Sequence, residues 1–230
     1  VRALMVSHNF EHEGAPNSMF EMVRGLTERG ILAPVVMSPS DGPIRSHYER
    51  AGIEVLIAPN PISDVYSAAQ YDTNRDALAE MVTRQGFEAV YGNTLQTFWA
   101  ISAAARAGVP AVWNPRESEP WDAYFNYLPE ELRSYAYDGF RTAYSVVFVA
   151  NATREGWQPV NTRNNFRVIP NGISLERLAS RSGGWDRIRA REELGVDANE
   201  SVVVLVGTVC DRKGQIDLVE AVPHLISDRR

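Results

Sequence analysis

The chain has 230 residues, of which 44% are hydrophobic, and its formal net charge is −6. That length suits one complete domain and part of a second, since a domain holds about 100 to 200 residues. The acidic balance disfavours nucleic acid as a partner, because binding to phosphates needs a basic face. No apolar run approaches the ~20 residues that cross a bilayer, and no secretion signal opens the sequence. We therefore expect a soluble, cytoplasmic protein, with peripheral membrane contact left open.

Short apolar runs alternate with longer amphipathic stretches over the first 170 residues or so. Seven of these runs predict strands: Ala3–Val6, Val35–Met37, Glu54–Ile57, Ala89–Tyr91, Ala111–Trp113, Val146–Val149 and Arg167–Ile169. Several are apolar throughout, which is typical of parallel strands with helices on both faces. Between the runs, apolar residues recur every three or four positions, and Gly30, Gly86 and Gly108 stand where helices should stop. The pattern predicts an α/β fold with one parallel sheet between two helical layers.

A turn cluster at Pro170-Asn171-Gly172 marks the end of this first domain, 1–172. We interpret residues 173–200 as a linker with a helix around Trp185–Leu194. The apolar run Val202–Val206 then predicts a new strand, which a polar loop and an amphipathic helix follow. One strand and two helices cannot build a core of their own. Residues 201–230 should therefore be the truncated start of a second sheet domain.

Ligands of open parallel sheets bind beyond the carboxyl ends of the strands, so the segments that follow strands are the candidate sites. After the first strand, a polar loop leads through Gly14 into a helix that Asn17 or Ser18 can cap, and free N–H groups there favour an anion or a sugar hydroxyl. After the fifth strand, Arg116 and Glu117 lie in a polar cluster between tryptophans, a combination typical of carbohydrate sites. Taken alone, an ordinary turn and a solvated, salt-bridged loop explain these two segments equally well.

Five segments extend this pattern along the whole chain. They are Glu13-Gly14-Ala15, Asn114–Glu119, Val147–Thr153, Val168–Ile173 and Val206–Gly214. In this order and spacing the sequence resembles the retaining GT-B glycosyltransferases of the group 1 class, family four. The last two segments, which correspond to the hinge and to the opening loop of the second domain, are the most specific.

The resemblance implies two Rossmann-like domains with a nucleotide-diphosphate-sugar donor between them, and transfer with retention to a carbohydrate, lipid or small-molecule acceptor. It implies no metal, and the sequence has no Asp-Xaa-Asp pair to hold a divalent ion against phosphates. On the acceptor side it implies Gly14, Asn17, Arg116, Glu117 and Asn151. For the donor phosphates it implies Gly207, Thr208, Arg212 and Lys213. The family's paired-glutamate segment is not reached before Arg230, so we assign no catalytic residue and expect this chain alone to be inactive.

Two positions depart from the family pattern. Thr208 stands where many members carry an arginine, so either Arg212 takes over that role or phosphate binding is weaker. Arg116 and Glu117 stand where many members carry a histidine, which indicates a subgroup that uses a guanidinium and a carboxylate. Lys213 is the only lysine among 23 cationic residues, and it precedes a glycine at the start of a helix. A compact ammonium group at that place favours contact with a diphosphate.

Two other functions stay open from the sequence. The segment from His8 to His12 matches the H-x-x-E-H motif of some zinc peptidases. It follows a strand and precedes Gly14 and Pro16, whereas the zinc motif requires a helix to bring both histidines to one face. A non-catalytic module that binds a sugar or an acceptor would show the same sheet and loops. A zinc assay tests the first alternative. Calorimetry with nucleotide diphosphates and candidate acceptors, on this chain and on a form with a complete second domain, tests the second.

Overall fold

The computed structural model describes residues 1–183 and 186–227 of the chain. It divides into two compact units, Val1–Gly172 (unit 1) and Ile173–Arg230 (unit 2). Within the described residues, none of the helices combines the length and the apolar character needed to cross a bilayer.

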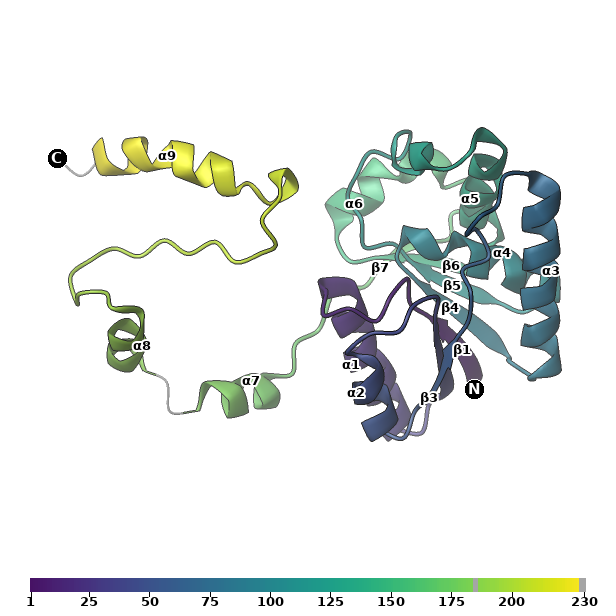
Figure 1. Ribbon diagram of the computed structural model, residues 1–230, viewed down its shortest axis with the longest axis horizontal. Coiled ribbons are helices and arrows are strands. Elements are labelled where there is room, and N and C mark those ends of the chain that lie inside the picture. The colour runs from purple at the N-terminus through teal and green to yellow at the C-terminus, as the bar shows by residue number, and fades with distance from the viewer. Residues whose placement is uncertain (184–185, 228–230) are drawn as a thin grey trace. The chain divides into compact units, whose positions relative to one another are not determined.

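Unit 1 is built on a sheet of seven strands in the order β3-β2-β1-β4-β5-β6-β7, and every neighbouring pair is parallel (Figure 1). The strands are β1 (Arg2–Val6), β2 (Ala33–Ser38), β3 (Glu54–Ile57), β4 (Ala89–Asn93), β5 (Ala111–Asn114), β6 (Ser145–Phe148) and β7 (Phe166–Val168). Each of the seven predicted strands is confirmed, and each overlaps its predicted range.

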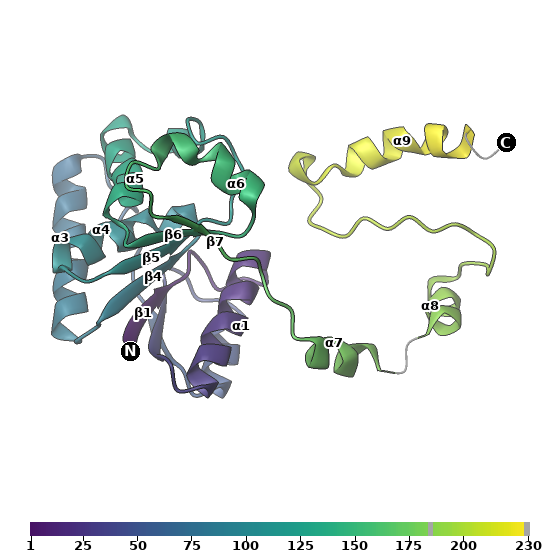
Figure 2. The same ribbon diagram turned by 180° about the vertical axis from the view of Figure 1, so that it is seen from behind.

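Helices cover both faces of the sheet, as the sequence predicted (Figure 2). One layer holds α1 (Gly14–Glu28) and α2 (Arg45–Arg50), and the other holds α3 (Ala68–Arg84), α4 (Phe98–Ala107) and α5 (Glu130–Thr142). Alternate side chains of β1 face the two layers, so Ala3 and Met5 join the core under α1 and α2, while Leu4 and Val6 join the core under α3, α4 and α5. Each fully buried leucine or valine contributes about 1.5 to 3 kcal/mol.

The core beneath α5 is aromatic and tightly packed. Trp113 of β5 lies 4.5 Å from Phe140, centroid to centroid, and Phe140 stacks on Trp157 at 5.1 Å. Gly139 makes this packing possible, because a Cβ atom there would lie 3.0 Å from Cζ3 of Trp113. The indole N–H of Trp113 donates a hydrogen bond of 2.8 Å to the carbonyl of Thr94. The core therefore reaches up to the carboxyl end of β4.

The chain reverses its winding direction between β1 and β4. From β1 it adds β2 and β3 on one side, and from β4 it adds β5, β6 and β7 on the other. The loops that leave the adjacent strands β1 and β4 therefore diverge, which is where open parallel sheets bind their ligands. In unit 1, two short helices, α2 and α6 (Asn151–Gly156), were not predicted, since six residues give too few turns for an apolar period to show.

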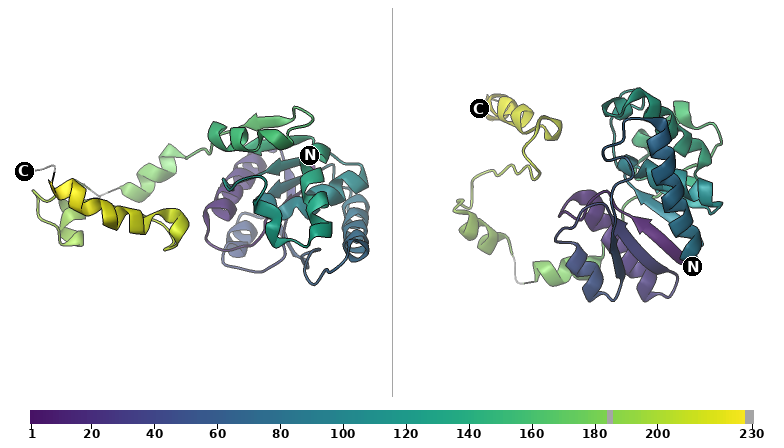
Figure 3. Two further views of the ribbon diagram at one scale, coloured as in Figure 1. Left: turned by 90° about the horizontal axis from the view of Figure 1, so that it is seen from above. Right: turned by 45° about the vertical axis from the view of Figure 1, so that its right-hand side comes forward.

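Unit 2 holds α7 (Leu175–Ser182), α8 (Arg187–Leu194), the short 3-10 helix η4 (Asp211–Lys213) and α9 (Gln215–Ser227) (Figure 3). The predicted helices after Trp185 and after Lys213 are present, but the predicted strand Val202–Val206 is wrong: the described part of unit 2 contains no strand. The five side chains of Val202–Val206 are 38% to 90% exposed. A strand is stabilised by hydrogen bonds to a neighbouring strand, and the described part of unit 2 offers none.

Candidate functional site

The loop after β1 enters α1 four residues earlier than the capping residues predicted. The helix begins at Gly14, and Glu13 occupies the N-cap position without a side-chain capping bond. Asn17 and Ser18 therefore lie inside the helix, where the Asn17 side chain donates to the Glu13 carbonyl at 2.8 Å. Pro16 permits the early start, because a first-turn residue has no intrahelical partner for the N–H that proline lacks. The prediction that Asn17 or Ser18 caps the helix is wrong.

Gly14 is exposed at the first turn of α1. A Cβ atom built there would meet nothing within 4 Å, so packing inside the protein does not require glycine at this position. The N–H groups of this first turn have no intrahelical acceptor, and they carry the positive end of the helix dipole. The start of α1 is consequently open and polar.

Arg116 joins four segments of unit 1. Its Nε donates to Oδ1 of Asn93 at 3.2 Å, and its Nη1 donates to Oγ of Ser18 at 3.2 Å and to Oδ1 of Asn171. Ser18 also donates to Asn171 at 3.3 Å. These contacts link the ends of β4 and β5 with α1 and with the turn that follows β7. We call Arg116, Ser18, Asn93 and Asn171 the Arg116 cluster.

Asn93 is the member of this cluster that sequence reasoning missed. Its side chain is fully buried at the end of β4 and donates to the Ala15 carbonyl in the first turn of α1 at 3.0 Å. It thereby links the end of β4 to α1, the helix that follows β1. Its position directly after an apolar strand was the available signal, but a single asparagine before Thr94 equally indicates an ordinary turn.

Glu117 is turned inward. Its carboxylate accepts hydrogen bonds from the N–H of Leu95 at 2.9 Å, from its neighbour's N–H at 2.8 Å and from the Tyr124 hydroxyl at 3.3 Å. Desolvation raises the pKa of Glu117, and these donors oppose the rise. The sequence suggested that this carboxylate contacts the acceptor; the geometry favours a positioning role, because the group holds together the loops after β4 and β5.

Thr94 has an unusual backbone conformation, with φ 79° and ψ 160°. A β-branched residue pays roughly 1 to 3 kcal/mol for such a conformation, which persists only where the surroundings enforce it. Here the Thr94 N–H donates to the Asn114 carbonyl at 2.9 Å, and the Thr94 carbonyl accepts from the Trp113 indole and the Thr97 hydroxyl. This geometry brings the next N–H, that of Leu95, to the Glu117 carboxylate.

Asn151 is the remaining predicted residue of unit 1. It is exposed at the start of α6, directly beyond the carboxyl end of β6. Gly14, Arg116, Glu117 and Asn151 therefore all follow strands at the carboxyl edge of one sheet. Among the described residues, hydrogen bonds join the start of α1, which holds Gly14, with Asn93 and with the loop of Arg116 and Glu117. No described hydrogen bond joins Asn151 to the Arg116 cluster.

The predicted phosphate residues lie on one loop of unit 2. The Gln215 side chain braces this loop by donating to the Thr208 carbonyl at 3.0 Å and accepting from the Cys210 N–H at 3.5 Å. The Lys213 side chain is exposed, and a Cβ atom at Gly207 would lie 3.7 Å from its Cγ and Cδ. The backbone of Arg212 belongs to η4, while its side chain lies outside the described part of the structure.

The histidines of the H-x-x-E-H segment lie on the loop before α1 and not on a helix. His8 contacts the Glu13 carboxylate at 3.4 Å, and the His12 ring lies 5.5 Å from that of His47. Among the described residues, no three His, Cys, Asp or Glu side chains are grouped to hold a metal ion. The arrangement lacks the helical face on which the zinc motif depends.

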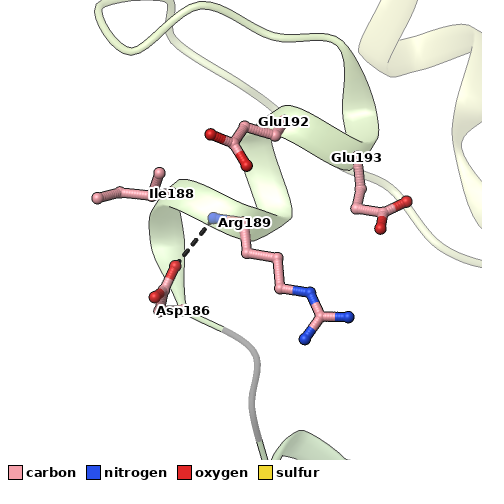
Figure 4. Close-up of a pocket in the computed structure, with 5 residues that line it drawn as sticks. All are labelled: Asp186, Ile188, Arg189, Glu192 and Glu193. Carbon is pink, nitrogen blue, oxygen red and sulfur yellow. Dashed lines mark hydrogen bonds between the residues drawn. The ribbon is translucent and has the colours of Figure 1, made fainter.

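Two hollows are lined by other residues. One is a groove between α3 and α4, lined by Asp76, Glu80 and Arg106 among others. The other lies along α8, where all the lining residues come from that helix and its N-cap, Asp186, which accepts from the Arg189 N–H at 2.9 Å (Figure 4). Neither contains a predicted site residue.

Three solved structures show what this fold is similar to. Anabaena HepE in complex with UDP superimposes with a TM-score of 0.70 at 19% identity, over 96% of this chain and 57% of HepE. The UDP-GlcNAc 2-epimerase of Neisseria meningitidis gives 0.53 at 15% identity over 85% of this chain and 53% of the epimerase. The lipopolysaccharide outer core galactosyltransferase WaaB gives a TM-score of 0.52 at 10% identity, over 76% of this chain and 46% of WaaB. The chain thus spans little more than half of the length of HepE. At identities this low, the similarity shows a shared fold and nothing more.

The family comparison is more specific. No curated protein matches the chain. Residues 12–177 match the family described as Glycosyltransferase Family 4. That range includes α1, strands β2 to β7 and the turn at Asn171, and so contains the full Arg116 cluster. The family and the GT-B fold class that the sequence resembled are confirmed. The chain belongs to Glycosyltransferase Family 4.

Proposed function

We propose that this chain supplies the acceptor-binding domain, residues 1–172, and the opening of the donor-binding domain, residues 201–230, of a retaining glycosyltransferase. Residues 173–200 connect them. The observation that carries the proposal is the Arg116 cluster, which gathers polar side chains from four segments at the reversal point of the sheet in a chain of this family. Ordered polar groups at this edge suit an acceptor with hydroxyl groups.

On the donor side, we propose that the loop of Gly207, Thr208, Arg212 and Lys213 binds the phosphates of a nucleotide-diphosphate-sugar. Support comes from the position of Lys213 beside Gly207 and from the two hydrogen bonds that the Gln215 side chain makes to the backbone of this loop. HepE was solved with UDP and with UDP-glucose, so UDP-glucose is the first donor to test. The proposed reaction requires no metal ion.

We also propose that the 230-residue form does not by itself catalyse sugar transfer. Residues 202–206 are unpaired and exposed, so the described part of unit 2 lacks the sheet that would support a complete donor site. Transfer then needs a second sheet domain to be completed. If the chain instead works as a non-catalytic binding module, it should bind a sugar or an acceptor, and joining it to a complete second domain should produce no transfer.

Calorimetry with UDP-glucose tests the donor assignment. The titration uses the 230-residue chain and the same chain joined to a complete second domain. In the completed form, Lys213→Ala should weaken affinity by ~1.5 to 3 kcal/mol, the range for hydrogen bonds to charged groups. Lys213→Arg should recover only part of it, since a planar guanidinium does not replace a compact ammonium. Unchanged affinity in both variants would remove Lys213 from the site, and no binding or turnover by the completed form would overturn the proposed function.

A further inference from the structure

Arg116 is a charged side chain that the protein positions but does not neutralise. Its partners Asn93, Ser18 and Asn171 are all neutral. In the described part of the chain, no carboxylate lies within 4.0 Å of its guanidinium, whereas Arg24, Arg45, Arg75, Arg106, Arg141 and Arg154 each make such an ion pair. An arginine needs no charged partner when water surrounds it, but Arg116 is half-buried. Its charge is therefore available to a ligand.

The nearest carboxylate in the sequence, Glu117, is directed elsewhere. It accepts from the Leu95 N–H, the Arg116 N–H and the Tyr124 hydroxyl. Two adjacent residues of opposite charge could have paired, and the loop instead separates their side chains. Holding an arginine side chain in one conformation costs up to ~2 kcal/mol of rotamer entropy. A guanidinium fixed at such a cost, with its charge left uncompensated, is preorganised for an anion.

The surroundings strengthen the attraction. The Tyr91 hydroxyl lies near the guanidinium, and desolvation raises the pKa of Tyr91 to about 12 although the Arg116 charge opposes the rise. Tyr91 and Arg116 are both half-buried, and charges at such a site interact more strongly than they do in bulk water. Ser18 places the guanidinium against α1, whose first turn contains no acidic residue, while the N-cap Glu13 directs its carboxylate to His8 and Asn9. The helix dipole at that end has the same sign as Arg116 and adds to its field.

We propose that Arg116 binds an anionic group, a carboxylate or a phosphate ester, on the acceptor. This inference rests on the proposed function and specifies its acceptor as a charged molecule. A guanidinium has five N–H donors, and Asn93, Ser18 and Asn171 occupy those of Nε and Nη1, so the two N–H groups of Nη2 are the donors left for a carboxylate or phosphate oxygen. The donor phosphates have their own proposed cations on unit 2, Arg212 and Lys213, so Arg116 serves a second anion.

NMR on the uniformly ¹⁵N-labelled 230-residue chain tests this directly, because the arginine Nε–H signals report each guanidinium separately. Inorganic phosphate and glucose 1-phosphate are titrated at constant ionic strength, with neutral glucose in parallel. Both phosphates should shift the Arg116 signal, and glucose should not. Arg116→Gln should weaken glucose 1-phosphate binding about tenfold or more, and Arg116→Lys should weaken it less. Arg163→Gln is the control, since Arg163 is exposed and its described side-chain contact is with the Arg141 carbonyl.

The outcomes separate cleanly. Equal weakening by Arg163→Gln, or no weakening by a folded Arg116→Gln, overturns the inference. If Arg116→Gln fails to fold, an unshifted Arg116 signal in the unmodified chain, or undiminished binding by Arg116→Lys, overturns it. If UDP binding falls as much as glucose 1-phosphate binding in Arg116→Gln, the anion belongs to the donor and the acceptor assignment is wrong. A third result is also possible: the two phosphates leave the Arg116 signal unshifted, while Lys213→Ala still weakens UDP-glucose binding in the completed form. In that case only this inference fails, and the proposed function stands.

Discussion

The guanidinium of Arg116 donates a hydrogen bond to the side-chain carbonyl of Asn171, 55 residues further along the chain. One residue follows β5, and the other lies in the Pro170-Asn171-Gly172 turn where unit 1 ends. The contact ties the loop proposed to hold the acceptor to the segment that leads out of the domain. A substitution of Arg116 or of Asn171 should therefore disturb both the loop after β5 and the turn after β7.

Asn171→Ala should lower the free energy of unfolding of unit 1 by about 0.5 to 1.5 kcal/mol, because Arg116 and Ser18 both lose an acceptor. Urea unfolding followed by tryptophan fluorescence measures the change. Asn126→Ala is the matched control, since Asn126 is exposed and no side-chain hydrogen bond is described for it. Equal stability of the two variants would show that the contact with Arg116 carries no energy.

Glu117→Ala should destabilise unit 1 by about 1.5 to 3 kcal/mol, since the N–H groups of Leu95 and Arg116 lose a charged acceptor. Glu117→Gln keeps one carbonyl oxygen and should cost less. Glu155→Ala, at an exposed glutamate, should stay within about 0.5 kcal/mol of the unmodified chain. A Glu117→Ala variant as stable as Glu155→Ala would mean that the carboxylate does not hold the two loops together.

The same residue predicts a pH effect. Desolvation raises the folded-state pKa of Glu117 above 4.5, so the folded state binds this proton more tightly than the unfolded state. The stability that this proton contributes is complete below pH 4.5, and it is lost as the pH rises through the folded-state pKa. The free energy of unfolding of the unmodified chain, minus that of Glu117→Gln, should therefore decrease with rising pH. A difference that grows with pH would show that the hydrogen bonds outweigh desolvation.

Two glycine-to-alanine substitutions should change the free energy of unfolding of unit 1 in opposite directions. Gly139→Ala should destabilise unit 1 by about 1 to 3 kcal/mol, because the new methyl group would lie 3.0 Å from the buried Trp113 ring. Gly25→Ala, in the interior of α1 with nothing within 4 Å, should stabilise by about 0.5 to 1 kcal/mol through helix propensity. Thermal unfolding of both variants provides the comparison. Stabilisation by Gly139→Ala would refute the packing described for Trp113.

The sequence predicted the sheet well because its strands are apolar on both faces and its long helices repeat an apolar face, which are both local signals. It could not predict Asn93 as a bridge, because that role arises only from the pairing of β4 with β1, 80 or more residues away. The inward turn of Glu117 depends on the strained backbone of Thr94, which no pattern of residue types encodes. Residues 202–206 have the composition of a strand, but a strand forms only beside a partner.

Backbone hydrogen exchange, on the chain joined to a complete second domain, tests most directly whether the carboxyl edge of the sheet is the substrate site. Adding UDP-glucose with glucose 1-phosphate should slow exchange at Gly14–Ser18 and at Arg116 and Glu117. The groove between α3 and α4, lined by Glu80 and Arg106, should exchange as before. Protection of that groove, with the segments at Gly14 and Arg116 unchanged, would contradict the account.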